Sequence, residues 1–246
     1  FHLREDATWT NGDPVTAQDF VYSWKRTLSP ELAADYAYQL YGVKGAAEYN
    51  GCTEKDCSAL ADEVGVTAVD DYTLQVELTS EQPWFLGQVS HHSFLPVHQA
   101  TVEEFGDNWT DPENIVTNGP FMLESWDHEA SINMVKNPDY RDAANVSLER
   151  IDGPIIVDGI TRVQAFEAGE VDATDGGALP PEEIERLKTE PYYDQYPALG
   201  TYYYGFNVEN IGLEQRKAMS LAINRKIITY QIDRTGRALA TGMTPP

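Results

Sequence analysis

The stretch from residue 7 to residue 26, which reads A-T-W-T-N-G-D-P-V-T-A-Q-D-F-V-Y-S-W-K-R, constrains the fold more than any other part of the chain. Asn11-Gly12 predicts a tight turn, because both residues tolerate a positive φ. Pro14 cannot donate a hydrogen bond to a strand ladder, so the strand predicted at residues 2–9 has to end before it. We therefore expect a strand, a turn and then a new element.

The new element is predicted to be a helix over residues 16–27. Thr16 is a good N-cap, and Asp19 at N3 completes a near capping box with its carboxylate at the positive end of the helix. The apolar residues at helical spacing are Ala17, Phe20, Val21 and Trp24. The polar residues off that face are Gln18, Ser23 and Lys25. The pattern predicts a helix that docks through one apolar face.

Two hairpins and a strand–helix–strand unit are predicted further along. Alternating apolar residues at 64–69 and 73–78 flank Asp70-Asp71, and the same pattern recurs at 121–126 and 131–135. A buried strand at 151–157, a helix at 160–168 and a strand at 171–174 predict a βαβ unit of a mixed sheet. The remaining predictions are helices at 30–49, 101–105, 180–188 and 213–225, a short helix opened by Pro83, and an aromatic strand at 201–207.

The charge balance excludes several classes of partner. With 17 basic and 40 acidic residues the formal net charge is −23, which repels nucleic acid and anionic lipid surfaces. Such an excess of acidic residues is typical of a highly soluble protein, and a cation-binding surface is the alternative interpretation. No run approaches the length that a membrane span needs, so no direct membrane insertion is expected. The chain also begins without the pattern of a signal peptide.

Cys52 and Cys57 flank a four-residue polar loop. The spacing is not that of a redox C-x-x-C motif, and zinc binding would require histidines nearby. In an oxidising compartment a small local disulfide is favoured over two free thiols.

Nothing in the sequence favours catalysis or a cofactor. The acidic pairs are explained by turns and by a helix N-terminus, as at Asp70-Asp71 and Glu182-Glu183. His91-His92 is a weak metal candidate, because neighbouring side chains diverge on a strand. The 14 tyrosines are more informative, since a flat apolar ring with a polar tip suits a cleft for varied ligands.

The chain resembles the extracellular solute-binding proteins, family 5, and within them the oligopeptide-binding branch of bacterial peptide ABC transporters. The first motif, F-H-L-R-x-x-A-x-W-x-N-G-D-P-V-T-A-x-D-F-V-Y-S-W-K-R, opens the chain. Further matching motifs are G-V-T-A-V-D-D-Y-T-L-Q-V-E-L, F-G-D-N-W-T-D-P-E-N-I-V-T-N-G-P-F, K-N-P-D-Y, F-E-A-G-E-V-D and T-Y-Y-Y-G-F-N. The likeness covers nearly the whole sequence.

The resemblance implies the periplasmic-binding-protein class II fold, an α/β architecture with mixed sheets, two main lobes and an extra lobe. Family members are about twice as long, so we expect this chain to lack a beginning and an end. The implied domains are an extra α+β lobe at 1–98, main lobe I at 99–199, and the start of the second main lobe at 200–246. Leu95-Pro96-Val97-His98 would be one of two strands that cross between lobes.

The resemblance also places ligand-binding residues. Tyr36 matches a tyrosine that lines the cleft, and Tyr203 matches the middle tyrosine of the aromatic strand. Asp175-Gly176-Gly177 replaces a Tyr-Asn-Asn triplet, which implies a roomier and more acidic sub-pocket that favours basic peptides. Gly205 replaces an acidic residue of the family.

The implied function is a periplasmic or extracytoplasmic receptor, expected to be monomeric, that captures short peptides and delivers them to ABC transporter permease subunits. Both a free receptor and one anchored to the membrane through the missing N-terminus fit this expectation. One alternative is the same fold with another ligand, such as a nickel chelate, haem or a sugar. A secreted carboxylate hydrolase is a further alternative, and the chain alone would bind nothing if half of its cleft is missing.

Overall fold

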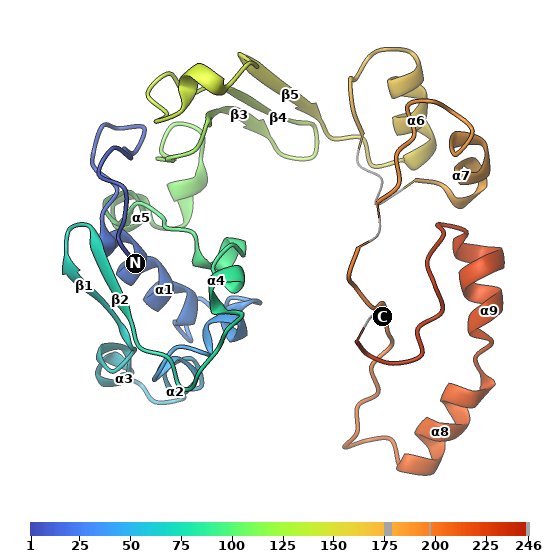
Figure 1. The fold of residues 1–246 in the computed structure, drawn as a ribbon, viewed down its shortest axis with the longest axis horizontal. Helices are drawn as coiled ribbons and strands as arrows, with labels where there is room; N and C mark the ends of the chain where they lie inside the picture. Colours follow the sequence, from blue (N-terminus) through green and yellow to red (C-terminus); the bar gives the residue numbers. More distant parts are fainter. Residues whose placement is uncertain (175–178, 197, 245–246) are drawn as a thin grey trace. The chain divides into compact units, whose positions relative to one another are not determined.

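A computed structural model describes residues 1–174, 179–196 and 198–244 (Figure 1). The chain divides into two compact units, Phe1–Ile155 and Ile156–Pro246. The lobe boundaries at 98/99 and 199/200 remain a prediction. Across the described ranges, the helices lack the combination of length and apolar character required to cross a membrane.

The predicted turn and helix cap at the start of the chain are confirmed. Gly12 has a φ of 92°, and the turn is tied to a distant segment because the Thr10 N–H donates to the Thr117 carbonyl at 2.8 Å. Helix α1 spans Ala17–Leu28. The Asp19 carboxylate accepts hydrogen bonds from the Thr16 backbone N–H at 2.8 Å and from its hydroxyl at 3.2 Å. The capping box thus fixes where α1 begins.

Helix α1 supplies one side of the core of the first unit. Its buried residues are Ala17, Val21, Ser23, Trp24 and Leu28, and Phe20 packs partly buried against the same core. Ser23 was predicted to lie off the buried face, and this was wrong. Its hydroxyl donates to the Asp19 carbonyl at 2.6 Å and accepts from the Val97 N–H at 2.8 Å. A buried hydroxyl is accommodated there because both hydrogen bonds are made.

The first predicted hairpin is confirmed. Strands β1 (Val66–Asp70) and β2 (Thr73–Val76) pair antiparallel and pack against α1. The Asp70 carboxylate accepts a hydrogen bond from the Tyr72 N–H at 2.9 Å, which is the predicted turn chemistry. The strand predicted at 2–9 is wrong. Only an isolated bridge of His2 to Thr73 and another of Thr8 to Pro14 are formed, because the chain leaves β2 after Leu3.

Short helices connected by turns cover the rest of this core. The helical stretch predicted at 30–49 is not continuous, because an isolated bridge of Val43 to Leu78 and a turn at Gly45, with a φ of 71°, separate two short helical segments. Cys52 and Cys57 form the predicted local disulfide. The helical segments are η1 (Ala37–Leu40), α2 (Ala46–Asn50), α3 (Ser58–Asp62), α4 (Phe85–Gln88), η2 (His92–Phe94), α5 (Gln99–Phe105) and η3 (Gly106–Thr110).

Residues 95–98 do not form the predicted crossing strand. They run as irregular chain into α5, where His98 is the N-cap. The His98 Nδ1 accepts from the Thr101 N–H at 3.3 Å, so its Nε2 carries the proton and donates to the Asp13 carboxylate at 3.1 Å. This segment is therefore held by side chains, with Val97 bonded to Ser23, rather than by a strand ladder.

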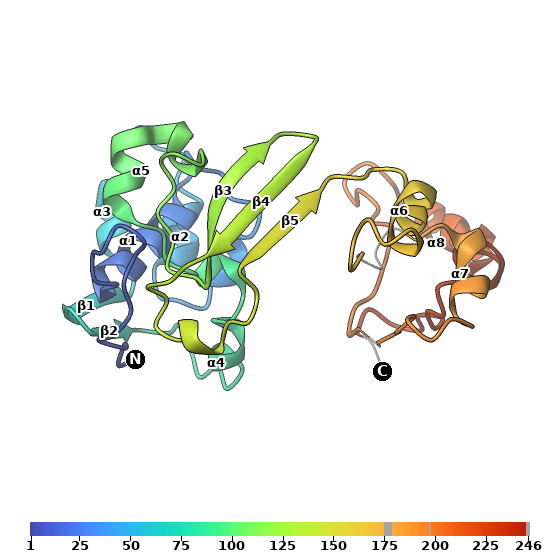
Figure 2. The same cartoon turned by 90° about the horizontal axis from the view of Figure 1, so that it is seen from above.

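The second hairpin is confirmed and is extended to a three-stranded antiparallel sheet, visible in Figure 2. Its order is β3 (Phe121–Asp127), β4 (Ser131–Lys136) and β5 (Arg150–Pro154), with the short 3₁₀ helix η4 (Ala143–Asn145) before β5. The βαβ prediction is wrong. Strand β5 pairs antiparallel to β4 and is half-exposed, and residues 171–174 are irregular. The apolar composition of this segment predicted a buried strand in a βαβ unit. The direction of a strand depends on its partner, and β4 pairs with β5 in the antiparallel sense.

The regular elements in the described part of the second unit are helices joined by long irregular segments. Its helices are α6 (Gly159–Glu167), α7 (Pro181–Leu187), α8 (Leu213–Ala222), α9 (Arg225–Ile227) and the π-helical segment η6 (Ile228–Asp233). Gly169 ends α6 with a φ of 73°, and Glu182 and Glu183 lie in the first turn of α7, both as predicted. The strand predicted at 201–207 is wrong, because these residues are irregular and pair with no strand of the described chain.

The N-cap of α6 should make the second unit sensitive to acid. The Asp158 carboxylate accepts from the Thr161 hydroxyl at 2.7 Å and from its N–H at 2.8 Å, and these bonds lower the pKa of Asp158 from its ordinary value of 3.8. A group whose pKa is lower in the folded than in the unfolded state stabilises the fold at pH values above its unfolded-state pKa. This stabilisation is lost as the pH falls through the folded-state pKa. The Thr161 amide resonance should therefore shift as pH is lowered below 3.8.

Asp158→Asn is the matched variant, because asparagine caps equally well without titrating. We expect its helicity by circular dichroism to lose this part of the acid dependence, while Asp158→Ala lowers helix stability at neutral pH as well. An acid profile unchanged in Asp158→Asn would contradict the assignment.

Candidate functional site

Tyr36 lies at the start of η1 with its ring in contact with other rings. Its centroid is 6.0 Å from Tyr38, 5.1 Å from His91 and 5.3 Å from His92. The two histidine rings are 4.1 Å apart and tilted by 31°. Tyr36 is 45% exposed and Tyr38 is 55% exposed. We call Tyr36, Tyr38, His91 and His92 the ring cluster.

Hydrogen bonds hold the two segments that carry the ring cluster. The Gln88 amide of α4 donates to the Gln39 carbonyl of η1 at 2.8 Å. The His91 Nδ1 accepts from the Ser93 N–H at 3.3 Å, so His91 caps η2. Phe94 at the end of η2 is buried against Trp24 of α1. Tyr36, Tyr38 and His92 are thus exposed and His91 is partly buried, while Phe94 anchors the end of η2 in the core.

The prediction that the side chains of His91 and His92 diverge on a strand is wrong. They are the N-cap and the first residue of the 3₁₀ helix η2, and their rings contact one another. Among the described residues, no group of three or more His, Cys, Asp or Glu residues is placed to hold a metal ion. No sequence pattern indicated that Gln88 belongs here, because its bond to Gln39 joins segments 49 positions apart. Tyr38 was missed although it lies only two positions from Tyr36.

The other predicted ligand residues belong to the second unit. Tyr203 is 62% exposed, and Gly205 has open space where a side chain would lie. The rings of Tyr202 and Tyr204 contact each other at 5.8 Å, although this described segment forms no strand. Asp175, Gly176 and Gly177 lie outside the described residues.

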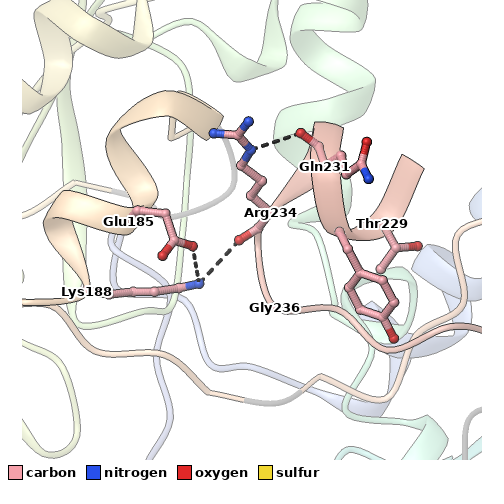
Figure 3. Close-up of a pocket in the computed structure, with 7 residues that line it drawn as sticks. Glu185, Lys188, Thr229, Gln231, Arg234 and Gly236 are labelled. Carbon is pink, nitrogen blue, oxygen red and sulfur yellow. Dashed lines mark hydrogen bonds and ion pairs between the residues drawn. The ribbon is translucent and has the colours of Figure 1, made fainter. Parts of the chain in front are cut away.

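Each unit contains a cavity lined by described residues. The cavity of the second unit, about 550 Å³, lies between α7 and η6 (Figure 3). There Lys188 donates to Glu185 and to the Arg234 carbonyl, both at 3.3 Å, so its charge is already compensated. The cavity of the first unit, about 290 Å³, is lined by Ala7, Thr8, Asn118, Gly119, Pro120, Tyr140 and Arg141. The lining of these two cavities includes none of the predicted ligand residues that the structure describes.

Comparison with known protein families gives a match over residues 1–246 to the model of the bacterial extracellular solute-binding proteins, family 5. The chain belongs to this family. It is 37% identical over 253 residues to the periplasmic oligopeptide-binding protein OppA of Escherichia coli, and this alignment covers 100% of the chain and 46% of that protein.

Solved structures give the same result for the fold. The crystal structure of Haemophilus influenzae OppA in complex with the peptide RPPGFSPFR matches with a TM-score of 0.89 at 36% identity, covering 100% of this chain and 48% of that one. The Escherichia coli murein tripeptide-binding protein MppA matches with a TM-score of 0.88 at 33% identity, with the same coverage. The chain thus spans less than half the length of these relatives and shares their α/β periplasmic-binding-protein fold over that span.

Proposed function

We propose that this chain forms part of an extracytoplasmic receptor that captures short peptides between two lobes and delivers them to an ABC import permease. The observation that carries the proposal is the family match over the whole chain. It is supported by the fold similarity to a relative whose structure holds a nonapeptide. On this basis we extend peptide binding from these relatives to this chain.

In the proposed mechanism the peptide lies extended and is bound through its backbone, in the manner of strand addition. Water fills the space around its side chains, so many sequences are accepted. Ligand binding shifts the equilibrium between open and closed lobes toward the closed form, which the permease recognises. No bond of the ligand is broken, and the receptor acts as a monomer without a cofactor.

The proposed binding residues divide into two kinds. Tyr36 and Tyr203 supply half-exposed to exposed rings with polar tips, which contact varied side chains without demanding one shape. Asp175, with glycines at 176 and 177, brings a carboxylate without bulk. We therefore propose that basic peptides are preferred over acidic ones.

Calorimetric titration of tripeptides into the full-length protein and into the 246-residue chain tests the proposal. We expect saturable 1:1 binding without turnover, and Lys-Lys-Lys to bind about fivefold to tenfold more tightly than Glu-Glu-Glu at low salt. This preference should shrink as salt is raised, because the charges are solvated. Equal affinities would refute the acidic sub-pocket, and hydrolysis of the peptides or no binding to the full-length protein would refute the receptor.

A further inference from the structure

We propose that the ring cluster is a specificity site that selects an aromatic side chain of the bound peptide. Two tyrosines and two histidines lie in continuous ring contact, from Tyr38 through Tyr36 to His91 and His92, whose rings contact each other. This inference rests on the proposed function, because it names the class of peptide that the same receptor prefers.

The cluster leaves ring surface unused within the described chain. Tyr36 and Tyr38 are about half exposed, and His92 is exposed as well. The cation–π contacts found among the described residues are made by Arg26 over Trp109 and Arg141 over Tyr140, so neither involves a cluster ring. Exposed rings gathered at one place are typical of an interaction surface, whereas a single exposed ring is not.

The geometry favours another ring over an aliphatic side chain. Tyr36 meets His92 nearly at right angles, at 85°, while His91 and His92 lie closer to parallel, so both edges and faces are presented. Aromatic rings prefer offset-stacked or edge-to-face partners at about 4.5–7 Å, a geometry in which the ring quadrupoles are complementary. A phenylalanine, tyrosine or tryptophan of the peptide gains this ring–ring term in addition to apolar burial, whereas a saturated side chain of equal size gains the burial alone.

The surface is also arranged before ligand binds. The bond from Gln88 to the Gln39 carbonyl ties η1 to α4, and the cap by His91 fixes the first residues of η2. A surface whose rings are already held loses less conformational freedom on binding, so more of the contact energy becomes affinity. Gln88 is thus a positioning residue, whereas Tyr38 and His92 would contact the ligand.

The test compares phenylalanine with cyclohexylalanine, which has similar size but no aromatic ring, at each position of a trialanine host peptide. Calorimetry on the full-length protein should show, at one position, phenylalanine binding about two- to tenfold more tightly than cyclohexylalanine. The ratio should approach one in His92→Leu and in Tyr38→Leu. It should persist in Trp84→Leu, a control at an exposed aromatic residue outside the cluster.

The ratio of two ligands on one variant is independent of how much of that variant is folded. An unchanged ratio in both cluster variants, with peptides still bound, would overturn the specificity site and leave the receptor intact. A third peptide carries arginine at the same position. If it bound more tightly than the phenylalanine peptide, the specificity site would also be overturned, since this result would indicate cation recognition. No binding of any peptide would overturn the receptor proposal itself.

Discussion

Trp24→Ala is expected to lower the free energy of unfolding of the first unit by about 3–5 kcal/mol. The Trp24 side chain is 2% exposed, and its ring contacts Phe94 edge-on at 5.2 Å. Its indole N–H also donates to the Phe94 carbonyl at 2.9 Å, so truncation leaves both a cavity and an unpaired acceptor. Such a loss is a large fraction of the stability of a typical domain.

Urea denaturation followed by tryptophan fluorescence measures this effect selectively. All five tryptophans lie at or before residue 126, so the signal reports on the unit Phe1–Ile155. Trp24→Phe should lower the stability less than Trp24→Ala, because it keeps most of the aromatic ring. It should still be destabilising, because it removes the N–H donor to the Phe94 carbonyl. Trp84→Ala, at a residue that is 64% exposed, should change stability by less than about 0.5 kcal/mol. Equal losses at Trp24 and Trp84 would contradict the described core.

Gly45→Ala is expected to destabilise the same unit by about 2–5 kcal/mol. Gly45 has a φ of 71°, and a Cβ there would lie 2.7 Å from the Glu63 carbonyl oxygen. That backbone cannot move aside easily, because the next segment is tied by the bond from the Gly65 N–H to the Lys44 carbonyl at 2.8 Å. Backbone strain and a steric clash therefore add together.

Gly12→Ala is the matched control for Gly45→Ala. Gly12 also has a positive φ, of 92°, but a Cβ at this position would have no described atom within 4 Å apart from its chain neighbours. We expect the substitution to cost only about 1–2 kcal/mol, from the backbone conformation. The difference between the urea unfolding midpoints of the two variants measures the steric clash of a Cβ at residue 45 with the Glu63 carbonyl. If the Gly12 variant were as unstable as the Gly45 variant, the close approach of residue 45 to Glu63 would be contradicted.

Local signals in the sequence predicted the elements whose stabilising groups are close in the chain. The cap made by Thr16 and Asp19, the turn at Asn11-Gly12 and the hairpin around Asp70 each depend on residues within a few positions. Isolated strands could not be predicted in this way, since a strand exists only where a partner supplies its hydrogen bonds. The aromatic stretch 201–207 has strand composition but no partner in the described chain.

The candidate site was predictable only where family resemblance reached it. Tyr36 was named from the motif positions, but its contacts with His91 and His92 were not, because they form only where η1 and η2 meet. Tyr38, two positions along the chain, was also missed. Gln88 was also missed, since its bond to Gln39 spans 49 positions. Such contacts depend on how the core orders the segments, which no local pattern encodes.

Mass spectrometry of the small molecules released when the purified full-length protein is denatured tests the receptor proposal most directly. The proposal predicts a mixture of peptides a few residues long, enriched in basic residues. A nickel chelate, haem or a sugar in place of peptides would leave the family assignment standing and would contradict the proposed ligand.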